Sequence, residues 1–234
     1  PDGVTAGDFF QKHPPPGMPD WLQEDNRIYC DSVAGLLHLS NLACVEIHTT
    51  LSRRPTLEVP DGVMIDLDPK ECDFSDVKEV AWEVGVLLDE IEWEGFVKST
   101  GSRGIHIFIP LKSGYSFEQS RLAAGVIAEI IRKRMPKLVT LERSPAKRPK
   151  GTVYIDAPQN RPSATTASVY SVRATPTASV SVPLHWEELD TPLGPRDFTI
   201  ANVSEWISGR ENLWSLEAVE GQSLEALLPR LELL

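Results

Sequence analysis

The chain has 234 residues, of which 41% are hydrophobic and 24% are charged, a balance typical of a folded globular protein rather than a disordered one. No apolar run is long enough for a membrane helix, and the first residues lack the regions of a signal peptide, so we expect a soluble intracellular protein without a membrane partner. The three cysteines have no metal-binding spacing, which argues against a disulfide framework or a structural zinc site, and we expect them to be buried thiols.

The formal net charge of −11 argues against a protein that binds nucleic acid over its whole surface. The charge is unevenly distributed, because residues 98–150 contain twelve Lys and Arg side chains and only three acidic ones. A polyanion responds to the local field, so this basic middle third is compatible with contacts to phosphate groups. A solvated helix face would explain any single one of these charges equally well.

The first elements are short. Residues 1–29 are rich in Pro, Gly and aromatic side chains, which predicts an extended segment rather than a regular element. Asp31 and Ser32 can cap a helix over residues 33–45, and a short strand is expected at 45–48.

Longer elements follow in alternation. Apolar residues recur with a period of two in 62–68, at three- and four-residue steps in 75–91, and again with a period of two in 104–110. A capping box at 116–119 begins a second long helix, and 151–158 is a further strand. This order of strand, helix, strand, helix, strand predicts an α/β or α+β domain with helices packed on one sheet.

The last part of the chain is less regular. Residues 162–183 are rich in Ser, Thr, Ala and Val and predict extended strands and loops. Residues 185–207 predict short helical turns separated by proline.

Two aspartates interrupt the apolar strand 62–68. Successive side chains of a strand point to opposite faces, so the apolar side chains face one way while Asp66 and Asp68 face the other. The same alternation leaves His106 and Asp156 on the polar face of their own strands. If these strands share a sheet and a register, the four side chains meet on one surface.

Neighbouring carboxylates repel each other unless a positive charge lies between them. Hard divalent cations such as Mg²⁺ and Mn²⁺ take carboxylate oxygens, and two such ions can hold a triphosphate and lower the pKa of an attacking hydroxyl. The alternative is a strand end with solvated aspartates before a proline turn. The third acid, Asp156, favours the metal hypothesis.

The segment KSTGSRGIHIFIP places a loop of small residues that contains Arg103 ahead of a strand. Backbone N–H groups of Gly-containing turns can bind an anion, hydroxyls can donate, and Arg can form a bidentate fork with phosphate oxygens. The segment matches neither the P-loop nor the dinucleotide-binding motif, and a plain turn would also fit it. His106 on the polar face of the following strand favours a triphosphate pocket.

The order of these motifs resembles the polymerase domain of bacterial and archaeal end-joining DNA ligases, in the archaeo-eukaryotic primase superfamily. The resemblance is carried by PDGV, FFQKH, PDW, LACVEIH, DLDP, STGSRGIHIFIPL, VYIDAPQN, TTASVYSVRA, VSVPLHWEEL and FTIANV. It implies a primase-polymerase core in which helices flank an RRM-like mixed or antiparallel sheet.

The resemblance also implies a domain organisation. One catalytic domain would span 1–234, with an aromatic and Pro-rich segment and a helix in 1–60 packed on a catalytic core in 61–190, and a helical tail in 191–234. The family usually has a further N-terminal segment with basic residues that bind a 5′ phosphate, and the resemblance predicts that this chain lacks it.

The resemblance assigns three groups of site residues. It implies metal-binding and catalytic roles for Asp66, Asp68 and Asp156. It implies nucleotide binding by His48, Thr100, Ser102, Arg103, His106, Gln159, Asn160 and Arg173. It implies DNA binding by Phe10, Lys12, Lys147, Arg148 and Lys150.

Three positions depart from the family pattern, and one of them is the position before the pair Thr165 and Thr166, which lacks the family's usual Lys. Arg103 stands where many relatives have Lys, which changes a point charge into a planar fork. Ala157 stands where an aromatic residue is common, so a ring is absent.

The implied activity is template-directed addition of nucleotides, with ribonucleotides preferred, at DNA gaps and broken ends in non-homologous end joining, using two Mn²⁺ or Mg²⁺ ions. The implied partners are DNA ends or a gapped duplex with a 5′ phosphate, NTP or dNTP, Ku and a DNA ligase module, in the prokaryotic cytoplasm at the nucleoid. The residues leave open a standalone primase-polymerase, a two-metal phosphodiesterase or nuclease, and an inactive module that binds DNA ends.

Overall fold

The computed structural model describes residues 14–24, 27–215 and 220–227. Its contacts divide the chain into two compact units, residues 1–45 and 46–234. The domain boundaries expected at 60 and 190 stay a prediction. Among the described residues, no helix has the length and apolarity needed to cross a bilayer.

The first unit contains short elements around a small apolar cluster. They are η2 (Asp20–Leu22), β1 (Gln23–Glu24), β2 (Arg27–Ile28) and α1 (Val33–Asn41). Ser32 caps α1 as predicted, because its hydroxyl accepts a hydrogen bond from the Gly35 N–H at 3.2 Å. Cys30 and Cys44 are exposed, so the prediction of buried thiols is wrong for these two, and Cys72 in the second unit is only partly buried.

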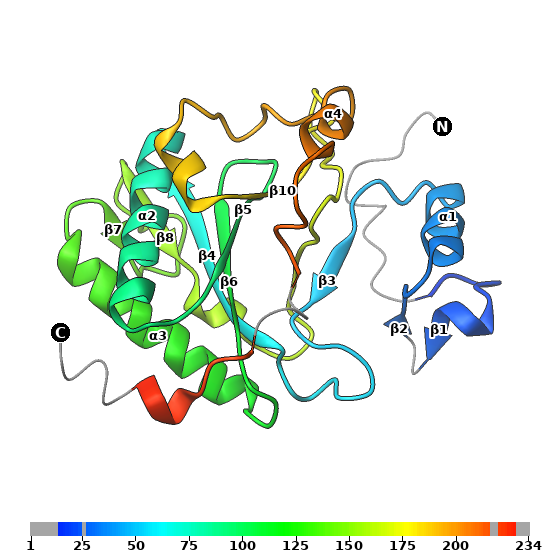
Figure 1. Ribbon diagram of the computed structural model, residues 1–234, viewed down its shortest axis with the longest axis horizontal. Helices are drawn as coiled ribbons and strands as arrows, with labels where there is room; N and C mark the ends of the chain where they lie inside the picture. The colour runs from blue at the N-terminus through cyan, green and yellow to red at the C-terminus, as the bar shows by residue number, and fades with distance from the viewer. Residues whose placement is uncertain (1–13, 25–26, 216–219, 228–234) are drawn as a thin grey trace. The chain divides into compact units, whose positions relative to one another are not determined.

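A six-stranded sheet forms the centre of the second unit, with the order β10-β5-β6-β4-β8-β7 (Figure 1). The strands are β4 (Gly62–Lys70), β5 (Phe96–Ser99), β6 (Ile105–Pro110), β7 (Val139–Thr140), β8 (Thr152–Ile155) and β10 (Val182–Leu184). All neighbours are antiparallel except β7 and β8, which are parallel. This mixed sheet with flanking helices confirms the predicted fold class.

The long helices α2 (Phe74–Glu90) and α3 (Phe117–Arg134) pack against this sheet (Figure 1). The predicted capping box is present at α3: the Ser116 N–H donates to Gln119 Oε1 at 2.8 Å, and the Gln119 N–H donates to Ser116 Oγ at 3.3 Å. The alternating pattern assigned one set of strand side chains to the core, among them Val63, Ile65 and Ile107. These side chains are fully buried in one cluster with apolar side chains of α2 and α3. Burial of this face fixes the strand register. The opposite face carries Asp66, Asp68 and His106, and also a smaller apolar cluster that includes Met64 and Phe108.

A second sheet pairs β3 (His48–Thr50) with β9 (Thr165–Ala167) in antiparallel register, with His48 opposite Ala167. The strand expected at 45–48 therefore begins at its last residue. The described part of this unit also contains the short helices η3 (Ala157–Gln159), η4 (Trp186–Asp190), α4 (Val203–Ile207) and η6 (Leu224–Ala226). Alternation did not predict β5 and β7, because four and two residues give too little of a pattern.

Candidate functional site

An open cavity of about 250 Å³ is lined by residues from both sheets of the second unit. Seven of the eight predicted nucleotide-binding residues line it, and so do Asp66 and Asp68. Only Asn160 of the nucleotide set lies elsewhere. Residues from positions 48 to 173 therefore meet around one space.

A row of polar side chains crosses the large sheet. Lys98 on β5 is in register with His106 on β6, and His106 is in register with Asp66 on β4. Beyond the end of β8, the Asp156 N–H donates a hydrogen bond to the Asp66 carbonyl oxygen at 2.9 Å. Asp156 therefore lies beside Asp66, although about ninety residues separate the two in the sequence.

The carboxylates on this face disfavour one another's ionisation. Burial, and then the negative charge of Asp66, raises the pKa of Asp68 to about 6. Burial and the same charge also raise the pKa of Asp156. The guanidinium of Arg148 opposes both shifts only in part. A cluster of acidic oxygens with this excess negative charge has the donor chemistry that a hard divalent cation prefers.

The three carboxylates do not converge on one point. In residues 14–24, 27–215 and 220–227, no three His, Cys, Asp or Glu side chains form a group that could hold a metal ion. The Tyr154 hydroxyl donates to Asp156 Oδ1 at 3.1 Å, and the Arg148 guanidinium lies 3.6 Å from the centre of the Tyr154 ring. These contacts hold the Asp156 side chain where it is. Joint coordination of one ion would require side-chain rotation.

His106 connects the acidic cluster to the rest of the cavity. Its Nε2 lies 3.3 Å from Asp66 Oδ1. Burial, and then the charge of Lys98, lowers the pKa of His106, so the ring is neutral at neutral pH. Its Nδ1 is buried and has no hydrogen-bond partner among the described residues. An unsatisfied buried nitrogen in a residue that lines a cavity indicates a site for a ligand or water.

The loop between β5 and β6 makes bonds within itself. Thr100 Oγ1 accepts hydrogen bonds from the N–H groups of Ser102 at 3.3 Å and Gly104 at 3.2 Å. Gly104 has no room for a side chain, because a Cβ atom would lie 2.3 Å from the Leu67 carbonyl oxygen. These two N–H groups, which the sequence suggested as anion donors, are thus already engaged. Arg103 makes no hydrogen bond or ion pair with any other described residue, so its guanidinium can bind an anion.

Glu46 joins two predicted nucleotide-binding residues, and sequence reasoning did not select it. Its Oε2 lies 3.0 Å from His48 Nε2, and its Oε1 lies 3.4 Å from Arg173 Nε and accepts the Ala174 N–H at 2.5 Å. Arg173 also donates from Nη1 to the Thr100 carbonyl oxygen at 2.8 Å, while its buried Nε has no hydrogen bond in the described part of the chain. The motif LACVEIH, with Glu46 two residues before His48, was the available signal.

The Asn160 side chain supports β4, the strand that carries Asp66 and Asp68, through hydrogen bonds to its backbone. Its amide nitrogen donates to the carbonyl oxygens of Met64 at 2.8 Å and Ala157 at 3.0 Å. Its amide oxygen accepts from the Met64 N–H at 2.8 Å and the Ser120 hydroxyl at 3.2 Å. Asn160 is 1% exposed. Its amide makes the hydrogen bonds to β4 that a neighbouring strand would otherwise make, at a position beyond the end of the β8 pairing.

The predicted DNA-binding residues are distributed over two regions. Phe10 and Lys12 lie outside the described residues. Lys147, Arg148 and Lys150 belong to the loop between β7 and β8, in which both lysines are exposed. This loop reaches the acidic cluster through Arg148, which stacks on Tyr154.

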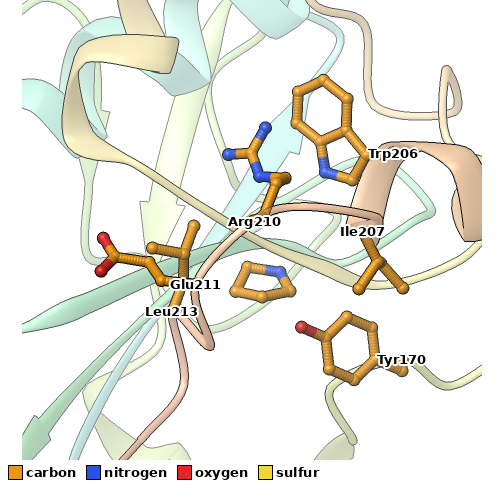
Figure 2. A pocket seen from close by; sticks show the side chains of 7 residues that line it. Tyr170, Trp206, Ile207, Arg210, Glu211 and Leu213 are labelled. Carbon is orange, nitrogen blue, oxygen red and sulfur yellow. The ribbon is translucent and has the colours of Figure 1, made fainter.

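A second hollow, of about 10 Å³, lies between Tyr170, Trp206 and neighbouring side chains (Figure 2). Figure 2 shows the Arg210 guanidinium beside the Trp206 ring, 4.0 Å from its centre. Two hydrogen bonds to Glu188, at 3.0 and 2.7 Å, engage the same guanidinium. Because this space holds at most about one water molecule, it offers no ligand site.

The sequence and fold are similar to those of known end-joining proteins. A family model described as "LigD, primase-polymerase domain" matches residues 1–214. The chain is 33% identical to the bifunctional non-homologous end joining protein LigD of Bacillus subtilis, over 87% of this chain and 34% of the relative. It is 27% identical to the multifunctional non-homologous end joining protein LigD of Pseudomonas aeruginosa, over 98% of this chain and 29% of the relative.

A solved structure with a similar fold is the polymerase domain of Mycobacterium tuberculosis ligase D in complex with DNA. It superposes with a TM-score of 0.71 at 28% identity, over 83% of this chain and 78% of that chain. The chain spans about a third of the length of the curated relatives.

Proposed function

Because the chain belongs to the LigD primase-polymerase domain family, we propose that it is a nucleotidyltransferase that extends DNA strands at gaps and broken ends in non-homologous end joining. The observation that carries the proposal is a single cavity lined both by carboxylates and by cations and hydroxyls. Asp66 and Asp68 supply the acidic groups, and Thr100, Ser102 and Arg103 are among the others. Acidic residues alone would suit a nuclease equally well, whereas the cationic groups suit a triphosphate.

Asp66, Asp68 and Asp156 are the residues that would hold divalent ions, either Mg²⁺ or Mn²⁺. The raised pKa of Asp68, about 6, reflects burial and negative charge that a cation would relieve. Two bound ions would lower the pKa of the primer 3′ hydroxyl and neutralise the departing pyrophosphate.

The chain's own cations and donors would orient the triphosphate. Arg103 can bind phosphate oxygens through its planar fork, and Arg173, which lines the same cavity and is ion-paired with Glu46, adds a positive charge beside them. His106 contacts Asp66 through Nε2 and holds that carboxylate in place. Groups fixed in this way stabilise developing charge without reorganising during the reaction.

Other assignments follow from the same cavity. His48 and Gln159 line it and keep their proposed contacts with the nucleotide, while Asn160 is reassigned to support of β4. The exposed Lys147 and Lys150 would contact the phosphate backbone of a gapped duplex with a 5′ phosphate. NTPs, used in preference to dNTPs, are the proposed substrates, with Ku and a ligase module as proposed partners.

A primer-extension assay tests this function. A labelled primer in a gapped duplex is incubated with NTPs or dNTPs, with Mn²⁺, Mg²⁺ or EDTA. We expect template-matched lengthening that is faster with NTPs and is lost with EDTA and in Asp68→Asn. Asp89→Asn, at an exposed position near the end of α2, is the matched control and should extend normally.

Three outcomes would overturn the proposal in different ways. Shortening of the primer would indicate a nuclease. Tight DNA binding without lengthening under either metal would indicate an end-binding module. New chains without a primer would indicate a standalone primase.

A further inference from the structure

Lys98 is a buried lysine to which the proposed function gives no role. It lies on β5 and is 1% exposed. Its Nζ donates to the Ala167 carbonyl oxygen at 2.9 Å and to Ser181 Oγ at 2.8 Å. Within the described ranges it forms no ion pair with a carboxylate. The ammonium is therefore held by neutral groups only.

Such a position is unfavourable for a charge. Burial lowers the pKa of Lys98 to about 7, while Asp66 raises it and Arg173 lowers it further. A buried apolar side chain of similar volume would avoid this desolvation cost. Stability of the empty protein therefore gives no reason for a lysine here.

The surroundings of Lys98 place it directly behind the cavity wall. Its strand partner His106 and its hydrogen-bond acceptor Ala167 both line the cavity. Ala167 belongs to β9 and is paired with His48 on β3. The ammonium thus links the six-stranded sheet to the two-stranded sheet, and these two sheets provide the walls of the cavity.

We propose that Lys98 is a positioning residue of the triphosphate site, which fixes β9 against β5 and attracts the phosphate chain with its buried positive charge. The inference rests on the proposed nucleotidyl transfer. Charges interact more strongly in a protein interior than in water, so this attraction reaches a ligand that Lys98 does not touch. It should therefore increase with the number of charged phosphates on the ligand.

Two substitutions test the charge. Lys98→Met removes the charge and both hydrogen bonds, and Lys98→Gln removes the charge but keeps a donor for Ala167. Binding of ATP, ADP and AMP in the presence of Mn²⁺ is measured by calorimetry, with circular dichroism as a check of folding. We expect the affinity to fall about tenfold for ATP, less for ADP, and no more than about twofold for AMP.

A matched control and a kinetic measurement accompany the binding data. The control is Lys78→Met. Lys78 also donates to a backbone carbonyl oxygen, that of Thr191, but neither residue lines the cavity. This substitution should leave the affinities for all three nucleotides unchanged. In primer extension, the KM for NTP of the Lys98 variants should rise more than their kcat falls.

The outcomes separate the inference from the proposed function. Equal losses for the three nucleotides in a folded variant would overturn the inference, because a purely structural role ignores ligand charge; unchanged ATP affinity would overturn it too. If Lys98→Met does not fold, Lys98→Gln decides in the same way. If the wild type binds ATP and the Lys98 variants show the graded loss of affinity, but the wild type never extends a primer, the polymerase function alone is refuted.

Discussion

Replacement of Asp68 by Asn should stabilise the metal-free protein while it abolishes extension. Burial and the charge of Asp66 raise the pKa of Asp68 from 3.8 to about 6. The difference is about two units at about 1.4 kcal/mol each, so the ionised side chain costs the folded state about 3 kcal/mol at neutral pH. Asn keeps the shape of the side chain and removes the charge, so we expect the free energy of unfolding to rise by about 2–3 kcal/mol.

The pH dependence gives the sign of this effect. Because the pKa of Asp68 is raised in the folded state, the stability that the protonated form contributes is fully present below pH 3.8 and is lost as the pH rises through about 6. The wild type should therefore lose stability relative to Asp68→Asn across this window. Below it the two proteins should be nearly equal.

Urea unfolding with EDTA, followed by tryptophan fluorescence across this pH range, measures the difference. Asp89→Asn is the control and should show little change at any pH. Added Mn²⁺ should narrow the difference, because an ion that binds only the folded wild type stabilises it. If Asp68→Asn proves no more stable than the wild type at neutral pH without metal, the carboxylates are not electrostatically frustrated and the reasoning fails.

Two further substitutions examine the support of the site. Asn160→Leu leaves two buried backbone groups of β4 without partners and should lower the free energy of unfolding in urea by about 2–5 kcal/mol; a loss below about 1 kcal/mol would mean that these groups find other partners. Glu46→Ala removes the carboxylate shared by His48 and Arg173 and should raise the KM for NTP about tenfold with a smaller change in kcat. An unchanged KM in steady-state extension would show that Glu46 does not position these residues.

Local patterns in the sequence were sufficient for the elements and their faces. The period of two in β4 and β6 predicted which side chains join the core beneath α2 and α3 and which lie on the opposite face of the sheet, because side-chain direction in a strand depends only on position along it. The caps of α1 and α3 were equally readable, since their bonds span three residues. The ordered motifs predicted the family, which the family match confirms.

Several site contacts could not be predicted, because they join distant segments. In the sequence, Lys98 looks like an ordinary charged residue of a loop. In the structure it lies on β5, and its ammonium donates to the carbonyl oxygen of Ala167, 69 residues later. Asn160 reads as part of a nucleotide motif until its amide bonds to β4, 96 residues earlier. Glu46 contacts the Ala174 N–H across 128 residues.

For the candidate metal ligands, the face of a strand that each one occupies follows from the sequence, whereas their arrangement in space depends on the tertiary structure. The sequence by itself determined that Asp66 and Asp68 share one face of a strand, because the backbone pleat leaves no other choice. Only the tertiary structure decided that Asp156 lies beside Asp66, because that depends on β8 pairing with β4 and ending where its next N–H meets the Asp66 carbonyl oxygen. Which strands become neighbours, and the residue at which their pairing ends, are properties of the assembled sheet, and the pattern within one strand does not specify them.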